Sequence, residues 1–168
     1  LTWETTVTMS SNKNKLISLN NALYETDNFK EVGGVSDPIS VTTHCMEVGT
    51  GLGDYWMLKS VGVDKDGFVL VEVKDENGNW VAKPFNTNLN VKENRQRCGN
   101  GMPDVYFGWN NTLRYKDFDL NMQFTGQFGF KILNAQRCFY ENNSIAYNRL
   151  KSADNYYPAI NADGTPYI

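Results

Sequence analysis

The chain has 168 residues, of which 40% are hydrophobic and 21% are charged, so its length and composition are those of one ordinary domain. Its formal net charge of -3, without any dense run of Lys and Arg, excludes a basic surface for nucleic acid, and no nucleic-acid partner is predicted. No stretch reaches the roughly 20 apolar residues of a membrane-spanning helix, whereas spanning β-strands need apolar residues only at alternate positions.

Residues 1–20 predict a first β-hairpin. Apolar residues alternate with polar ones at the start of the chain, which is the period of a strand with one apolar face; they are Leu1, Trp3, Val7 and Met9. Residues 12–14 (NKN) are suited to a turn. Because Ile17 and Leu19 continue the apolar parity, the predicted register pairs Met9 with Ile17.

Residues 21–103 are too many for an unstructured loop inside a compact domain, so an inserted segment with its own strands is predicted there. Residues 68–74 and 80–83 flank an Asn-Gly dipeptide, which is a hairpin signal. Residues 56–63 are a weaker strand candidate.

Residues 104–134 predict a second hairpin, because hydrophobicity alternates with period two almost without error and Lys116-Asp117 interrupts it as a turn. A one-residue slip would mix the two faces, so the register is well determined. It pairs Tyr115 with Phe118, Leu113 with Leu120, Trp109 with Phe124, Arg114 with Asp119 and Phe107 with Gly126. Residues 135–168 are predicted to be a second long loop, and both chain ends are expected to be truncation points of a longer protein.

The long two-faced hairpin predicts an all-β chain: a transmembrane antiparallel β-barrel segment of about four strands, arranged as two hairpins with a long extracellular insertion. A spanning strand needs about 9 to 11 residues, and a barrel has short periplasmic turns and long outer loops. The predicted membrane-facing residues are Trp3, Val7, Met9, Phe107, Trp109, Leu113, Tyr115, Phe118, Leu120, Met122, Phe124, Phe128 and Phe130. Trp3, Trp109 and Tyr115 are candidates for interfacial aromatic girdles. The alternative is a soluble β-sandwich that acts as a carbohydrate-binding or adhesin module.

The sequence predicts no catalytic residues, no metal site and no cofactor. A single histidine, His44, has no partner motif, and residues 64–67 and 75–79 are interpreted as turns because they lack the later ligands of a calcium loop. Cys45, Cys98 and Cys138 predict thiols or one loop disulfide. Tyr55, Trp56 and Trp80 are the candidate ligand contacts, because sugars stack on aromatic rings; packing within the insertion is the alternative for all three.

Several segments together resemble the SusC/RagA group of TonB-linked outer-membrane proteins. They are residues 14–19 (NKLISL), 47–49 (EVG), 54–56 (DYW), 59–64 (KSVGVD) and 113–120 (LRYKDFDL), followed by Gly126, Gly129 and Asn134. The resemblance covers nearly the whole chain in the right order. One departure is that residues 75–79 (DENGN) only partly match the Asp- and Gly-rich stretch that family members often carry.

The resemblance implies a barrel of about 22 strands closed by an N-terminal plug, in the outer membrane of a Gram-negative cell. It also implies import of oligosaccharides or peptides, energy from TonB acting through parts of the protein outside this chain, and a SusD-like surface lipoprotein as partner. Outer-membrane lipid would surround the wall, and the chain by itself would be no enzyme.

Overall fold

The computed structural model describes residues 1–19, 28–37, 39–142, 146 and 148–154. Strands dominate these residues, and the predicted all-β class is confirmed. The chain divides into two compact units, residues 1–30, 46–54 and 99–132 in the first and residues 31–45, 55–98 and 133–168 in the second. Among the described residues, no helix has both the length and the apolar character needed to cross a membrane.

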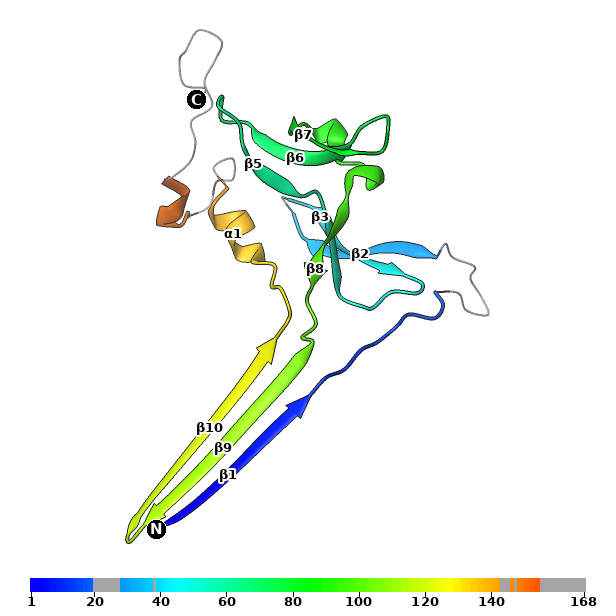
Figure 1. Cartoon of the computed structure of the whole chain (residues 1–168). Helices are drawn as coiled ribbons and strands as arrows, with labels where there is room; N and C mark the ends of the chain where they lie inside the picture. The colour runs from blue at the N-terminus through cyan, green and yellow to red at the C-terminus, as the bar shows by residue number, and fades with distance from the viewer. Residues whose placement is uncertain (20–27, 38, 143–145, 147, 155–168) are drawn as a thin grey trace. The chain divides into compact units, whose positions relative to one another are not determined.

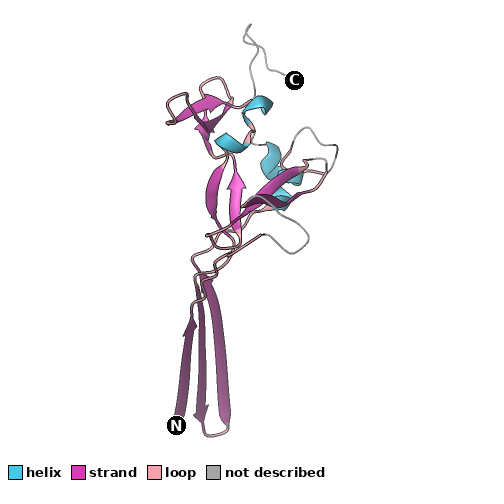
Figure 2. Ribbon diagram, turned by 90° about the vertical axis from the view of Figure 1, so that its right-hand side faces the viewer, coloured by secondary structure: helices cyan, strands magenta, loops and turns pink. Residues whose placement is uncertain are grey.

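The first unit contains a three-stranded antiparallel sheet in the order β1-β9-β10. Its strands are β1 (Thr2–Ser10), β9 (Val105–Tyr115) and β10 (Phe118–Phe128), which lie side by side in both views (Figure 1, Figure 2). The chain enters β1 at the end of the sheet that holds the β9–β10 turn. It therefore leaves β1, and later enters β9, at the opposite end.

The β9–β10 hairpin has the predicted register. Tyr115 pairs with Phe118, Trp109 with Phe124 and Phe107 with Gly126, so every predicted pair of this hairpin is confirmed. The turn is Lys116-Asp117, and Lys116 has a φ of 52°. Two-residue hairpin loops need a positive φ at their first position, because only then does the turn follow the right-handed twist of the strands.

The predicted first hairpin is wrong. Instead of folding back onto residues 15–19, β1 pairs with β9 along its whole length, with Met9 opposite Phe107 and Thr2 opposite Arg114. The backbone of Leu16 is bonded elsewhere, since its N–H donates to the Thr50 carbonyl at 2.8 Å and its own carbonyl accepts the Gly49 N–H at 2.8 Å. The described sheet therefore has three long strands where two hairpins would have given four.

Strand β10 also ends earlier than the alternation predicted. Gly129 has a φ of 81°, and a side chain at that position would overlap Asp104, so the extended conformation stops at Phe128. Phe130 follows the bend, is half-buried and lies outside the strand whose apolar face was predicted to carry it.

A second sheet has four strands in the order β2-β3-β4-β8. They are β2 (Phe29–Val35), β3 (Val41–Glu47), β4 (Asp54–Met57) and β8 (Gln96–Asn100). Val35, Thr43 and Cys45 are buried there. The weak strand predicted at residues 56–63 is thus divided, because its first part belongs to β4 in this sheet and its last part to another.

The third sheet is the predicted hairpin with one added strand, in the order β5-β6-β7. Its strands are β5 (Ser60–Val63), β6 (Val69–Lys74) and β7 (Trp80–Pro84). Asp64 and Asp75 begin two similar turns, each accepting backbone N–H groups from the residues two and four positions later at 2.8–2.9 Å. These bonds show that both acidic segments are turns, as the sequence predicted.

Short helical segments complete the described chain. Single 3-10 turns occupy Thr87–Leu89, Lys92–Asn94 and Lys151–Asp154, and α1 spans Ala135–Tyr140. Asn94 is buried, and its side chain accepts the Lys74 N–H at 3.1 Å and donates to the Leu89 carbonyl at 3.0 Å. That contact ties the turn to the strand that carries the buried Val71 and Val73. Of the loop predicted at 135–168, residues 143–145, 147 and 155–168 lie outside the described part.

The turn of the long hairpin supplies a stability test. We expect Lys116→Gly to stabilise the hairpin by about 1 kcal/mol, because glycine adopts a positive φ without the steric cost of a side chain. Asp117→Gly is the matched control and should give no gain, since a positive φ was found at Lys116 and not at Asp117. Denaturant unfolding of the full-length gene product in detergent measures both; equal effects would contradict the assigned turn geometry.

Candidate functional site

The three long strands carry an apolar face. Neighbouring strands place Trp3 opposite Leu113, Val7 opposite Trp109, and Trp109 opposite Phe124. The large side chains of this face are exposed, with Phe118 78% and Trp3 66% accessible. The other exposed members are Val7, Met9, Trp109, Tyr115, Leu120, Met122, Phe124 and Phe128, whereas Phe107 and Leu113 are half-buried. An apolar surface of this extent marks a contact with another apolar phase or partner.

Two polar residues, Thr5 and Asn111, interrupt this face, and both bind tryptophans. The Trp109 indole N–H donates to the Thr5 hydroxyl at 2.9 Å, and the Trp3 indole N–H donates to the Asn111 side-chain oxygen at 3.3 Å. Each bond joins β1 to β9. The sequence analysis assigned no function to these two residues. Each is a polar residue at a position of the apolar parity, and each lies diagonally across from a tryptophan of the neighbouring strand.

The opposite face of the same sheet is polar. Successive rows across the strands run from Thr2, Arg114 and Asp119 near the turn to Ser10, Tyr106 and Gln127 at the far end. Arg114 and Asp119 lie 3.5 Å apart and are both largely exposed, so their ion pair contributes little to stability. One face of the sheet is therefore apolar and the other is polar, except for the two residues that bind the indoles.

Tyr55, the first predicted ligand contact, is a packing residue. It is buried, its hydroxyl accepts the Leu133 N–H at 3.2 Å, and its ring lies 4.7 Å from that of His44. A ring enclosed in this way presents no face to a ligand.

Trp56 and Trp80 retain some accessible surface. The Arg97 guanidinium lies 5.8 Å from the Trp56 ring centre, and the Lys74 ammonium lies 5.3 Å from that of Trp80. Trp80 is 42% exposed, whereas Trp56 is half-buried. They occupy different sheets, β4 and β7, and their role as ligand contacts stays a prediction.

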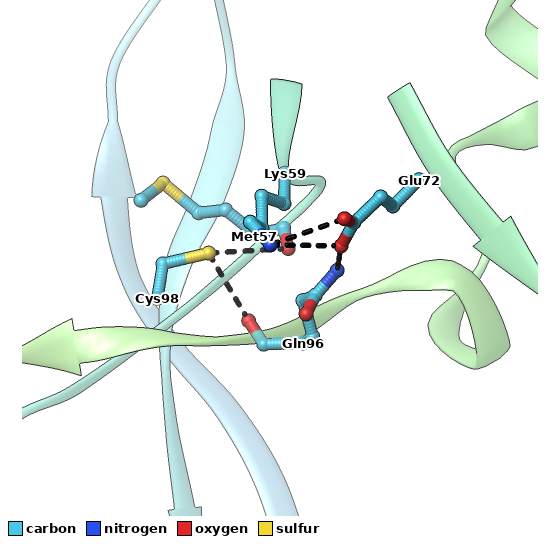
Figure 3. Close-up of polar contacts among 5 residues, drawn as sticks. All are labelled: Met57, Lys59, Glu72, Gln96 and Cys98. Atoms are coloured by element: carbon cyan, nitrogen blue, oxygen red, sulfur yellow. Dashed lines mark hydrogen bonds and ion pairs between the residues drawn. The ribbon is translucent and has the colours of Figure 1, made fainter. Parts of the chain in front are cut away.

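A polar cluster in the second unit centres on Glu72 of β6 (Figure 3). Its carboxylate accepts the Gln96 amide at 2.9 Å and the Lys59 ammonium at 3.0 Å. The Gln96 hydrogen bond, followed by Lys59, lowers the pKa of Glu72 below its ordinary value of 4.5. The Cys98 thiol donates to the Met57 and Gln96 carbonyls at 3.8 and 3.5 Å. These contacts connect β6 to β8 and to Lys59, which immediately precedes β5.

Arg95 organises a second cluster that sequence reasoning missed. One of its terminal nitrogens donates to Glu31 and Thr42, each at 2.8 Å, and its Nε donates to Asn90 at 3.0 Å. The Arg95 side chain is only 10% exposed. Its fork geometry connects β2, β3 and the turn before β8. Removing it would take the ion-pair partner from Glu31, whose carboxylate is 29% exposed and also accepts the Thr42 hydroxyl at 2.8 Å.

Neither cluster provides a catalytic or metal-binding set. Among the described residues, no group of three or more His, Cys, Asp or Glu side chains is placed to hold a metal ion. Cys45, Cys98 and Cys138 form no disulfide with one another. The most distinctive surface of the chain is consequently the two-faced sheet β1-β9-β10, whose strand length and alternation are those of a transmembrane β-barrel wall.

Comparison with known proteins supports that class. The chain is 28% identical over 139 residues to TonB-dependent receptor P3 of Formosa agariphila, which covers 79% of this chain and 14% of the relative. It is 27% identical over 164 residues to TonB-dependent receptor P26 of the same organism, covering 93% of this chain and 16% of the relative. No protein-family model matches the sequence.

The similarity supports a place among the TonB-dependent receptors and, with the β-rich fold, confirms the predicted location in the Gram-negative outer membrane. Both relatives are named as receptors, which fits the expectation that the chain is no enzyme. The chain spans about one-seventh of the length of the first relative and one-sixth of the second, so the similarity concerns only a part of each receptor.

The Glu72 cluster predicts a pH dependence. Because its pKa is lowered in the folded state, Glu72 contributes stability that is fully present above pH 4.5 and is lost as the pH falls below that value. Hydrogen-exchange protection of β6, corrected for the intrinsic rate, should therefore decrease between pH 6 and pH 3. In a Glu72→Gln variant this part of the pH dependence should be absent; an unchanged profile would contradict the assignment to Glu72.

Proposed function

We propose that this chain is a wall segment of a SusC-like TonB-dependent importer. The single observation that carries the proposal is the sheet β1-β9-β10, which is apolar and exposed on one face and polar on the other. The apolar face contacts outer-membrane lipid, and the polar face lines the lumen. The similarity to two TonB-dependent receptors supports the same class.

The connectivity of the sheet supports one orientation. The two-residue turn between β9 and β10 lies at one end, and residues 11–104 connect β1 to β9 at the other. Outer-membrane barrels have short turns on the periplasmic side and long loops outside. Residues 11–104 are accordingly extracellular in this proposal, and Lys116-Asp117 faces the periplasm.

The finer parts of the proposal concern the whole receptor. Substrates are oligosaccharides or peptides, a SusD-like lipoprotein covers the outer opening, and TonB supplies energy through segments outside this chain. These features rest on the resemblance of the motif segments to the SusC/RagA group. The membrane-facing set is the predicted one without Phe130, which lies beyond the bend at Gly129.

The rival function is a soluble β-sandwich module that binds carbohydrate or a cell surface. In a sandwich the apolar face would be covered by a second sheet about 10 Å away. The two functions differ in what covers Phe124, lipid or protein, and that difference can be measured.

Phe124→Arg tests the lipid-facing surface at the middle of its strand. In the full-length gene product we expect failure of barrel assembly or a loss of about 2–4 kcal/mol, because a cation at mid-membrane depth lacks solvation. The adjacent Gln123→Arg, on the polar face, is the matched control and should assemble normally. Heat-modifiable migration in outer-membrane fractions reports assembly. Equal tolerance of both variants would rule out a lipid-facing Phe124.

Thr5→Val tests the same surface through a hydrogen bond. In lipid the Trp109 indole N–H has no water to replace the Thr5 hydroxyl, so we expect a loss of about 1–3 kcal/mol in unfolding free energy. Trp109→Phe in the Thr5→Val background removes the orphaned donor and should recover that part of the loss.

Thr6→Val, on the polar face, is the control and should change stability by less than about 0.5 kcal/mol. Urea unfolding in lipid vesicles measures all the variants. If Thr5→Val and Thr6→Val behave alike, water reaches the indole and the face does not lie in hydrocarbon.

A further inference from the structure

Three segments of the first unit meet at the end of the long sheet that is remote from the turn. They are residues 12–14, which follow β1, residues 51–54, and residues 99–104, which precede β9; together they are called the junction. The Asn100 carboxamide, for example, donates to the Leu52 carbonyl at 2.9 Å. Segments that lie far apart in the sequence are therefore joined directly where the chain leaves the sheet.

Met102 lies on the surface of the junction. It is 45% exposed, and its N–H donates to the Asn100 side-chain oxygen at 2.6 Å. Its Cγ would lie 3.0 Å from a Cβ at Gly53, so the side chain packs against a position where glycine leaves the room. An open hollow of about 210 Å³ is lined by Met102 and other residues of the junction. A small molecule dissolved in water can therefore reach this side chain.

The Asn14 carboxamide connects Met102 to another segment of the junction. Its oxygen accepts the Leu52 N–H at 2.7 Å, and its nitrogen donates to the Met102 sulfur at 3.4 Å. A thioether sulfur is a weak acceptor, whereas a carboxamide nitrogen is a good donor with two hydrogens. The contact therefore places a good donor against a poor acceptor, and a stronger acceptor on Met102 would improve it.

The other four of the five methionines have different surroundings. Met46 and Met57 are half-buried. Met9 and Met122 are exposed, but they belong to the apolar face of the long sheet, which contacts lipid in the proposed function. Met102 is thus the methionine that is both exposed and outside that face.

We propose that Met102 is a site of oxidation by a hydroperoxide, and that Asn14 binds the sulfoxide oxygen that forms. A lone pair of the Met102 sulfur attacks one peroxide oxygen, so an S–O bond forms while the O–O bond breaks. The departing oxygen takes the hydroperoxide proton and leaves as water or an alcohol. Sulfur is oxidised by two electrons, and the peroxide is reduced by two.

The surroundings of Met102 suit the oxidised form. A sulfoxide within an apolar core disrupts the packing, because its oxygen is polar and lacks a partner there. At Met102 the Asn14 nitrogen already faces the sulfur, and the adjoining hollow has room for one more atom. Oxidation then strengthens the contact between residues 12–14 and residues 99–104. These segments begin and end the connection from β1 to β9, so the oxidised junction holds both ends of that connection more firmly.

The first test compares the oxidation rates of the methionines. The purified full-length receptor in lipid vesicles is treated with increasing hydrogen peroxide, and peptide mass spectrometry follows each methionine. We expect Met102 to react about tenfold or more faster than Met46 and Met57, because susceptibility follows exposure. A Met102 that reacts no faster than these two half-buried residues overturns the proposal.

The second test asks whether Asn14 binds the new oxygen. After oxidation, hydrogen-exchange protection of the Leu52 amide, which donates to Asn14, should rise about threefold or more. Asn14→Asp keeps an oxygen for Leu52 but removes the donor, so it should show no rise. Met102→Leu is the control for oxidation elsewhere, and peroxide should leave its Leu52 protection unchanged. Unchanged or reduced protection in the wild type, or an equal rise in either variant, overturns the proposal.

The same peptide map separates this inference from the proposed function. Met9 and Met122 report on the lipid-facing surface, because lipid would shield both from dissolved peroxide. Rapid oxidation of these two residues counts against the wall segment and leaves the Met102 site standing. Slow oxidation of Met9, Met122 and Met102 alike overturns the Met102 site alone.

Discussion

The backbone geometry of β1, β9 and β10 imposes one constraint on which the other features depend. Side chains of an extended chain alternate between two faces, and hydrogen-bonded neighbours share the same face. The observed register keeps the apolar residues together on both sides of β9. A slip of one residue would place Arg114 beside the apolar residues of its partner strands. The tryptophan bonds exist only in this register.

The β9–β10 hairpin was predictable because all its information is local. Two alternating runs are separated by Lys116-Asp117. Only one register of these runs keeps the apolar residues on one face of the hairpin and the polar residues on the other. The partner of β1 was not predictable by the same rule. Met9 keeps its parity whether it faces Ile17 or Phe107, so alternation alone does not choose between them. The distant pairing forms a complete nine-residue strand, Thr2–Ser10, and the local one would have used only a few pairs.

In the candidate site, too, local features could be predicted from the sequence and long-range contacts could not. Loop aromatics can be named from a sequence, but their exposure depends on distant contacts, as Tyr55 shows by bonding to Leu133 and packing on His44. The Arg95 cluster joins residues more than fifty positions apart in the chain. The long sheet likewise places Thr8 beside Gly108, one hundred residues later. Such sites require the long-range register before any residue can be assigned to them.

Thr5 and Asn111 are exceptions to the alternation, and the proposed environment explains them. A tryptophan ring suits a lipid-facing surface, but its N–H needs an acceptor that hydrocarbon does not provide. Each of the two residues supplies that acceptor from the neighbouring strand. In water a solvent molecule could accept the same bond, so neither side-chain acceptor would be needed. Thr5 is therefore the stronger support for contact with lipid, because the Asn111 amide nitrogen is itself buried without a hydrogen-bond partner among the described residues.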